Sequence, residues 1–225
     1  MRRIGRPSAA PAALLAVQLA GCAEMAATPA DGSRVSDDSA STYVYECDNR
    51  DPITVRVTEG KAWLFLPSQT IDLPRIVSAS GARFSDGESS YWSKGEEARF
   101  ELQGQTLSGC TNNRSLAVWE DAKLRGADFR ASGNEPGWNL EIFDGESVAF
   151  VNNYGQDRHL FSAPPPEVDR AVRATTYRLQ NRDHRLLVVV QGKPCRDSMS
   201  GEAFAATVTL IFDGKPLSGC GRALH

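Results

Sequence analysis

The chain is poor in histidine, has no closely spaced cysteine pair and contains no long hydrophobic run. Its three histidines, His159, His184 and His225, lack the spacing of metal ligands, and no C-x-x-C pair is present to begin a zinc site. The apolar run at residues 9–20 is too short to cross a bilayer as a helix. Neither a G-x-S-x-G nor an S-x-x-K motif occurs, so the nucleophile arrangements of common serine enzymes are missing. We therefore expect no metal, no cofactor and no catalytic activity.

The N-terminus combines three arginines within the first six residues, the short apolar run and a lone cysteine at its end. This order is typical of a secretory signal. The closing residues, L-A-G-C ending at Cys22, resemble the lipobox of bacterial lipoproteins. That resemblance implies that residues 1–21 are removed and that the Cys22 sulfur carries lipid, which anchors through about 0.8 kcal/mol per buried CH₂ group. Ala23, in place of an aspartate, resembles the pattern of outer-membrane sorting. A plain signal peptide with a chance cysteine is the alternative.

The charge balance is acidic, with 25 Lys+Arg against 28 Asp+Glu. Removing residues 1–21 takes away three arginines and leaves 22 basic against 28 acidic side chains, a net charge of −6. Most of this excess lies in residues 22–114, which carry nine basic and fourteen acidic side chains, a net charge of −5. Nucleic acid is therefore not an expected partner, whereas a basic protein is.

Four cysteines remain besides Cys22, and an even number in an exported chain indicates disulfides. Three pairings of Cys47, Cys110, Cys195 and Cys220 are possible. We favour 47–110 with 195–220, because each bridge then stays within one half of the chain. In the chain-entropy model, loops of these lengths stabilise the fold by roughly 3–4 kcal/mol each.

The rest of the chain is dominated by strand patterns. Residues 23–42 contain no aromatic side chain and are rich in Ala, Ser, Asp and Thr, which is typical of a flexible segment. Alternation at residues 53–57, a buried-type run at residues 63–66, and alternation at residues 138–142 and 204–212 predict strands. The predicted organisation is a signal peptide at 1–21, a lipidated tether at 22–42, a β domain at 43–114, a helical connector at 115–128 that Ser115 can cap and Gly126 can end, and a second β domain at 129–225.

Two motifs in the first β domain are more specific. Residues 77–84 contain S-G-x-x-F, residues 91–98 contain S-K-G-x-x-A, and Tyr45-x-Cys47 and Cys110 flank them. This combination, from residue 43 to about 113, resembles the membrane-bound inhibitors of c-type lysozyme, which are small β-barrel lipoproteins of Gram-negative bacteria. The resemblance implies a β-barrel, a c-type lysozyme as partner and membrane attachment through the Cys22 lipid.

The family's serine and lysine enter the lysozyme cleft, and here they fall on Ser80 and Lys94. The resemblance thus implies a lysozyme-binding site formed by these two residues with Gly81, Phe84 and Gly95. Two positions depart from the family pattern. Phe84 replaces the usual tyrosine, and Ser89 stands where an aromatic residue is usual.

The chemistry of the target supports the same two residues. A c-type lysozyme works with two carboxylates that flank the glycosidic bond, one protonated and one ionised. A lysine ammonium with three donors and a serine hydroxyl complement such a pair. Asp86-Gly87 lies between Ser80 and Lys94 and predicts a hairpin. A two-residue loop would pair Ser80 with Ser93, whereas a three-residue loop would set Ser80 opposite Lys94.

The second β domain contains two further segments, residues 129–138 and residues 195–201, that resemble an uncharacterised family of exported lipoprotein domains. Its last segment, ending L-S-G-C at Cys220, resembles the META type of heat-inducible lipoproteins. Neither resemblance implies a chemistry. Asn134-Glu135-Pro136-Gly137 is interpreted as a turn.

The sequence therefore predicts an all-β protein of two small disulfide-bridged β domains, an N-terminal barrel and a C-terminal META-like domain, joined by a short helix. The predicted function is an outer-membrane lipoprotein, facing the periplasm, that protects peptidoglycan by blocking c-type lysozyme. A non-catalytic structural or ligand-binding envelope lipoprotein with a degenerate inhibitor domain is the alternative.

Overall fold

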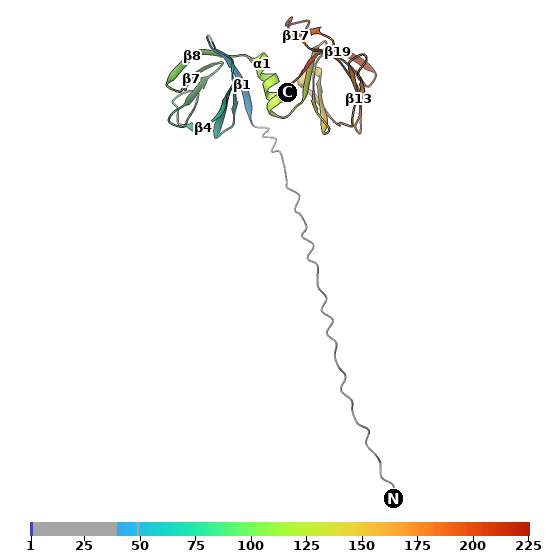
Figure 1. Cartoon of the computed structure of the whole chain (residues 1–225), viewed down its shortest axis with the longest axis horizontal. Coiled ribbons are helices and arrows are strands. Elements are labelled where there is room, and N and C mark those ends of the chain that lie inside the picture. Colours follow the sequence, from blue (N-terminus) through green and yellow to red (C-terminus); the bar gives the residue numbers. More distant parts are fainter. Residues whose placement is uncertain (2–39, 49) are drawn as a thin grey trace. The chain divides into compact units, whose positions relative to one another are not determined.

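The computed structural model describes Met1, residues 40–48 and residues 50–225 (Figure 1). The predicted signal peptide, Cys22 and the tether up to residue 39 lie outside the described residues.

The first β region is a closed, antiparallel barrel in chain order. Its strands are β1 (Ser41–Glu46), β2 (Ile53–Val57), β3 (Lys61–Leu66), β4 (Gln69–Ile76), β5 (Ala82–Ser85), β6 (Ser90–Lys94), β7 (Glu97–Leu102) and β8 (Gln105–Asn112).

Strand β1 begins two residues before the predicted domain boundary. Ser41 and Thr42 belong to it because they pair with Val57 and Arg56 on β2. The predicted tether therefore does not extend through residue 42. The other domain boundaries stay predictions.

Aromatic side chains fill the barrel. Tyr45, Phe84, Tyr91 and Phe100 are completely buried, and their neighbouring ring centroids lie 5.2–5.8 Å apart. The hydroxyl groups of Tyr45 and Tyr91 share a hydrogen bond of 2.9 Å, so the polar end of each ring has a partner inside the core. Burial away from water raises the pKa of both hydroxyl groups above its usual range.

One helix, α1 (Arg114–Leu124), follows the barrel. The predicted cap, Ser115, lies inside the helix, and Asn113 is the actual N-cap, because its side-chain oxygen accepts a hydrogen bond from the Leu116 backbone N–H at 3.0 Å. Asparagine caps helices as well as serine does. In the part of the chain that the structure describes, no helix is long and apolar enough to cross a membrane.

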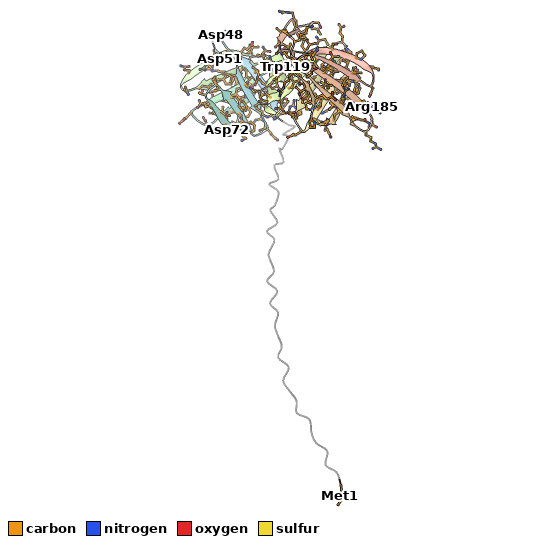
Figure 2. The ribbon with its side chains drawn as sticks, turned by 45° about the vertical axis from the view of Figure 1, so that its right-hand side comes forward. Met1, Asp48, Asp51, Asp72, Trp119 and Arg185 are labelled. Carbon is orange, nitrogen blue, oxygen red and sulfur yellow. A yellow bond between two sulfur atoms is a disulfide. The ribbon has the colours of Figure 1, made fainter. Side chains whose placement is uncertain are left out.

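Helix α1 makes polar contacts with the barrel and aromatic contacts with the second β region. Asp121 accepts a hydrogen bond from Thr42 on β1 at 2.8 Å and lies 3.6 Å from the Arg56 guanidinium on β2. Trp119 (Figure 2) is 5% exposed. Its ring packs against that of Phe204, with centroids 5.1 Å apart. The Arg222 guanidinium lies 4.6 Å from the Trp119 ring, as in a cation–π contact.

The second β region is a nine-stranded antiparallel sheet in the order β12-β11-β10-β9-β19-β18-β15-β14-β13, with a separate pair β16-β17. It curls so that β12 contacts β14. Its elements are β9 (Phe129–Asn134), β10 (Gly137–Phe143), β11 (Ser147–Asn152), the 3-10 helix η1 (Asn153–Gly155), β12 (Asp157–Ser162), β13 (Glu167–Asp169), β14 (Ala174–Gln180), β15 (Arg185–Gln191), β16 (Cys195–Arg196), β17 (Ala203–Phe204), β18 (Ala206–Phe212) and β19 (Lys215–Ala223).

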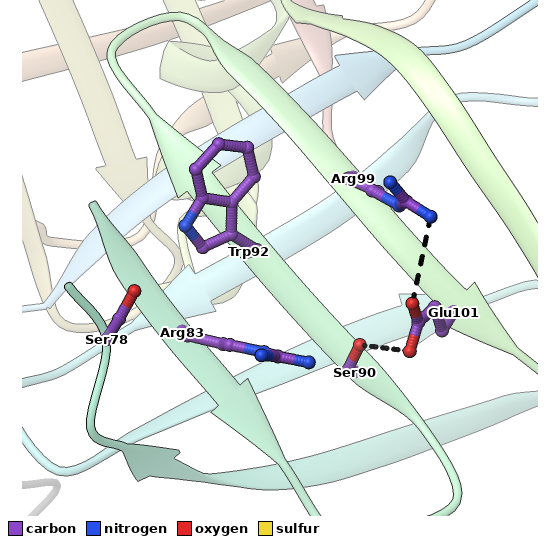
Figure 3. A pocket seen from close by; sticks show the side chains of 6 residues that line it. All are labelled: Ser78, Arg83, Ser90, Trp92, Arg99 and Glu101. Atoms are coloured by element: carbon purple, nitrogen blue, oxygen red, sulfur yellow. Dashed lines mark hydrogen bonds and ion pairs between the residues drawn. The ribbon is translucent and has the colours of Figure 1, made fainter. Parts of the chain in front are cut away.

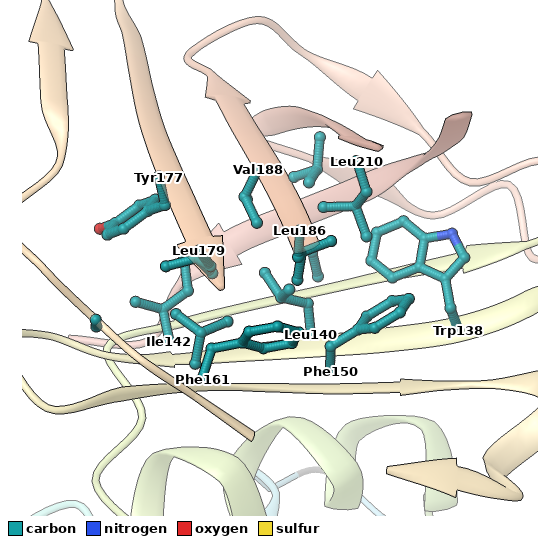
Figure 4. Close-up of a cluster of buried hydrophobic side chains, with 14 residues drawn as sticks. Trp138, Leu140, Ile142, Phe150, Phe161, Tyr177, Leu179, Leu186, Val188 and Leu210 are labelled. Carbon is teal, nitrogen blue, oxygen red and sulfur yellow. The ribbon is translucent and has the colours of Figure 1, made fainter. Parts of the chain in front are cut away.

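The concave side of this sheet holds one apolar core, in which Trp138, Leu140, Phe150, Phe161 and Leu186 are buried (Figure 4). The alternation in β10 and β18 predicted this side correctly. The strand predicted over residues 204–212 is divided, however. Phe204 belongs to β17 and pairs with Cys195, while β18 lies between β15 and β19.

Both β regions contain one disulfide, Cys47–Cys110 in the barrel and Cys195–Cys220 in the second region. These are the pairs that the sequence favoured. Together with the closed barrel, the curled sheet and the intervening helix, they confirm the predicted all-β fold class.

Candidate functional site

The β5–β6 hairpin carries the two sequence motifs, and its register differs from both predicted alternatives. Ala82 pairs with Ser93 and Ser85 pairs with Ser90, so the loop has four residues, Asp86–Ser89. Continuing this register places Gly81, not Ser80, across from Lys94. Asp86 causes the longer loop, because its carboxylate accepts hydrogen bonds from the backbone N–H groups of Glu88 at 2.9 Å and Ser89 at 2.7 Å.

Ser89, which stands where the family usually has an aromatic residue, is held by the hydrogen bonds of the Asp86 carboxylate. They stabilise the ionised carboxylate, so the pKa of Asp86 lies below its usual range. Ser89 is 9% exposed, and its carbonyl oxygen accepts a hydrogen bond from Ser85 Oγ at 2.8 Å. Ser89 thus completes a polar turn.

Ser80 lies at the opposite end of the hairpin, exposed, with its backbone held in place. Its carbonyl oxygen accepts hydrogen bonds from Trp92 Nε1 at 2.9 Å and from Ser78 Oγ at 2.7 Å. The Ser80 hydroxyl has no hydrogen-bond partner among the described residues. It is therefore positioned by its main chain and free to bind a partner.

Gly81 allows the loop that carries Ser80 to lie close to β6. Its φ is +69°, and a Cβ at this position would lie 2.2 Å from the Ser93 carbonyl oxygen. Only glycine satisfies both conditions without strain. The S-G pair of the motif is thus a free hydroxyl followed by the residue that lets the loop lie against β6.

Lys94 ends β6 and is exposed. No described carboxylate lies within ion-pair distance of its ammonium group. Gly95, with φ +62°, and Glu96 form the two-residue turn into β7. The Glu96 carboxylate accepts hydrogen bonds from Asn112 Nδ2 at 3.0 Å and Arg114 Nε at 3.2 Å, which lower its pKa. These contacts hold the turn that carries Lys94 while the ammonium stays free.

Phe84 is misplaced in the predicted binding set, because its side chain is completely buried and stacks on Tyr91 inside the barrel. It cannot touch a partner of the folded barrel and contributes only by packing. Gly95 and Gly81 likewise act through their backbone conformation. Of the five predicted binding residues, Ser80 and Lys94 alone present functional groups to solvent.

A groove that neither motif indicated lies on the outer side of β5, β6 and β7 (Figure 3). Its cavity volume is about 360 Å³. Arg83, Trp92 and Arg99 lie side by side across the three strands. Because Tyr91 points inward, alternation along β6 already requires Trp92 to point outward, and this signal was available in the sequence. The lining residues are Ser78, Arg83, Ser90, Trp92, Arg99 and Glu101.

Comparisons with known proteins cover the same part of the chain. A family model described as "Membrane-bound lysozyme-inhibitor of c-type lysozyme" matches residues 45–108. The "Membrane-bound lysozyme inhibitor of C-type lysozyme" of Escherichia coli (strain K12) is 34% identical over 87 residues, which are 38% of this chain and 73% of that protein. The chain belongs to this lysozyme-inhibitor family.

The protein of the same name from Yersinia enterocolitica (serotype O:8, biotype 1B) is 33% identical over 70 residues, 31% of this chain and 58% of that protein. No solved structure gives a significant match. The segment that matches the lysozyme-inhibitor family contains Ser80, Lys94 and the groove, whereas α1 and the second β region lie beyond it.

The barrel of this family member exposes carboxylates as well as unpaired cationic groups. Asp48, Asp51 and Asp72 are exposed on the barrel (Figure 2). Arg83 and Lys94, by contrast, lie on the outer face of β5 and β6 and have no ion pair with any residue that the structure describes. The site thus offers positive charge on a domain whose overall charge is negative.

Proposed function

We propose that the barrel inhibits a c-type lysozyme by inserting Ser80 and Lys94 into the catalytic cleft, and that it thereby protects peptidoglycan as a non-enzymatic inhibitor. One observation carries the proposal. The Ser80 hydroxyl and the Lys94 ammonium are both exposed and have no partner among the described residues, and they lie at the same end of a hairpin whose backbone is held by Trp92 and Glu96.

The chemistry of the cleft explains why these groups would block it. A glycosidase of this type needs one protonated and one ionised carboxyl group close together. The Lys94 ammonium would donate a hydrogen bond to the ionised carboxylate, and its positive charge would neutralise the negative charge of that group. The Ser80 hydroxyl can donate to one carboxyl group and accept from a neighbour. Because the backbone is already held, little backbone conformational entropy is lost on binding.

Turbidity measurements test the proposal. The chain from residue 23 to residue 225 should slow the clearing of bacterial cell walls by a c-type lysozyme, in proportion to complex formation. Undiminished clearing at saturating protein would refute the lysozyme-inhibitor function and favour a structural or ligand-binding role in the envelope.

Substitution of Ser80 by alanine should weaken lysozyme binding by about 10- to 150-fold, since a hydrogen bond to a charged group contributes about 1.5–3 kcal/mol. Surface-binding kinetics measure this effect. Ser108→Ala is a matched control, because Ser108 is an exposed serine on β8. Equal affinities of the Ser80 and Ser108 variants would remove Ser80 from the binding site.

The same proposal includes membrane attachment at the outer membrane, facing the periplasm, through lipid on Cys22. The L-A-G-C sequence and the membrane-bound names of the relatives support it. Metabolic labelling with radioactive palmitate should label the wild type and leave Cys22→Ser unlabelled, because the acyl acceptor is the sulfur itself. Equal labelling of both proteins would place the lipid elsewhere.

A further inference from the structure

We propose that the outer groove, formed by Ser78, Arg83, Ser90, Trp92, Arg99 and Glu101, is a second contact with the same lysozyme and receives a carboxylate side chain from the rim of its cleft. This inference rests on the proposed function and names the partner's chemistry at residues that neither sequence motif specifies. Arg83 occupies a variable position of the first motif, and Trp92 directly precedes the second.

The geometry places both contacts on one face. Trp92 and Lys94 are two residues apart on β6 and therefore point to the same side, about 7 Å from each other along the strand. A stable protein–protein interface covers about 800 Å² of each partner. A lysozyme that buries Lys94 at its centre would consequently also cover the groove.

The charges in the groove favour an anionic occupant. Glu101 is already engaged, because Ser90 Oγ donates to it at 3.1 Å and Arg99 lies 4.0 Å away (Figure 3). Arg83 is exposed, and its guanidinium group has no hydrogen bond or ion pair with the residues that the structure describes. Its side chain extends along the groove toward Ser90 (Figure 3). Two guanidinium groups thus face one carboxylate, which leaves one positive charge uncompensated. A guanidinium group binds a carboxylate through two parallel hydrogen bonds.

Trp92 adds an apolar wall to this charged site. Its indole ring is half-buried, and its N–H is used by the Ser80 carbonyl oxygen at 2.9 Å. The ring therefore offers its surface and not its donor, as an anchor residue in a protein interface does. It also joins the groove to the Ser80 loop, so the two contacts belong to one rigid surface.

Lysozyme affinity of single variants tests the inference in the full chain from residue 23. Arg83→Ala removes the free guanidinium group without touching the Ser80 loop, and it should weaken binding about tenfold or more, the effect of one lost charge-assisted hydrogen bond. Trp92→Phe loses the hydrogen bond to the Ser80 carbonyl oxygen but keeps an aromatic ring in the groove. Trp92→Ala loses both, so it should weaken binding more than Trp92→Phe.

Matched controls lie on other faces. Trp63 is a half-buried tryptophan of β3. Arg185 is an exposed arginine of β15 (Figure 2). Alanine at either position should change affinity by less than about twofold, as surface substitutions away from an interface do. Circular dichroism and thermal melting show whether each variant is folded.

The outcomes separate the two proposals. Weakening by Lys94→Ala with unchanged binding by Arg83→Ala would overturn the groove contact and leave the inhibitor function intact. Absence of wild-type binding would overturn both. If soluble peptidoglycan fragments bind the wild type but not Arg83→Ala, while lysozyme affinity is the same for both, the groove is a glycan site and the inference is wrong.

Discussion

Replacement of Lys94 by alanine is expected to weaken lysozyme binding by about 30-fold to several thousandfold. Truncation of one member of a buried, hydrogen-bonded charge pair costs about 2–5 kcal/mol, because the remaining charge stays buried without its partner. In this protein the Lys94 ammonium has no described internal partner to lose, so the whole effect should come from the complex. The loss should appear as faster dissociation.

Ionic strength distinguishes this local contact from the net charge of the tether and the barrel taken together. Residues 22–114 carry a net charge of −5, which attracts a basic lysozyme over a distance that salt shortens to about 8–10 Å. Raising the salt concentration should therefore slow association of the wild type and of Lys94→Ala alike. Surface-binding kinetics at two salt concentrations measure both rate constants.

Lys61→Ala is the control for Lys94→Ala, because both lysines lie on the barrel and are exposed. The Lys61 ammonium lies 3.5 Å from the Asp72 carboxylate and 4.2 Å from the Trp63 ring, so it is already engaged on the barrel surface. Its removal should leave lysozyme affinity within about twofold, since exposed pairs contribute about 0–1 kcal/mol. If Lys94→Ala also binds within about twofold of the wild type, insertion of the ammonium into the cleft is wrong.

Loss of the Cys47–Cys110 disulfide should destabilise the barrel by about 4 kcal/mol, within the usual range of about 2–5 kcal/mol. The bridge spans 63 residues and closes the ends of the barrel chain, so its absence enlarges the unfolded ensemble. The double variant Cys47→Ala, Cys110→Ala avoids a free thiol. Peptide-resolved hydrogen exchange would measure the opening free energy of β1–β8 separately from the second sheet.

The second disulfide provides the matched comparison. Cys195–Cys220 spans 25 residues, so Cys195→Ala, Cys220→Ala should destabilise the second β region by slightly less, about 3.5 kcal/mol. It should leave exchange in the barrel strands unchanged. Barrel destabilisation below about 1 kcal/mol in the first double variant would show that aromatic packing alone holds the barrel.

Much of the fold could be predicted because its signals are local. Alternation at Ile53–Val57 and at Trp138–Ile142 identifies β2 and β10 and the side of each that faces the core. The helix between the β regions was also predicted, although with the wrong cap. Asn113 is preferred to Ser115 because the preceding strand β8 ends one residue before Asn113, in extended backbone that an N-cap requires.

The candidate site was predictable in its residue types and not in its geometry. Ser80, Lys94 and Gly81 are recognisable from the motifs, and Phe84 was mistaken for a binding residue because a motif does not show which way a side chain points. The hairpin register escaped prediction because it depends on the Asp86 carboxylate, whose two backbone hydrogen bonds favour four loop residues over two or three.

By itself, the amino-acid sequence indicated the all-β class and the position of the two motifs, because these follow from residues close together, and it favoured one of the three possible cysteine pairings. Only the tertiary structure decided that Trp92 holds the Ser80 carbonyl oxygen, that Glu96 is held by Asn112 and Arg114, and that Arg83 and Arg99 flank one groove. These contacts join residues 12–18 positions apart in the chain. Their formation depends on strand register and on the closure of the barrel, which no local pattern encodes.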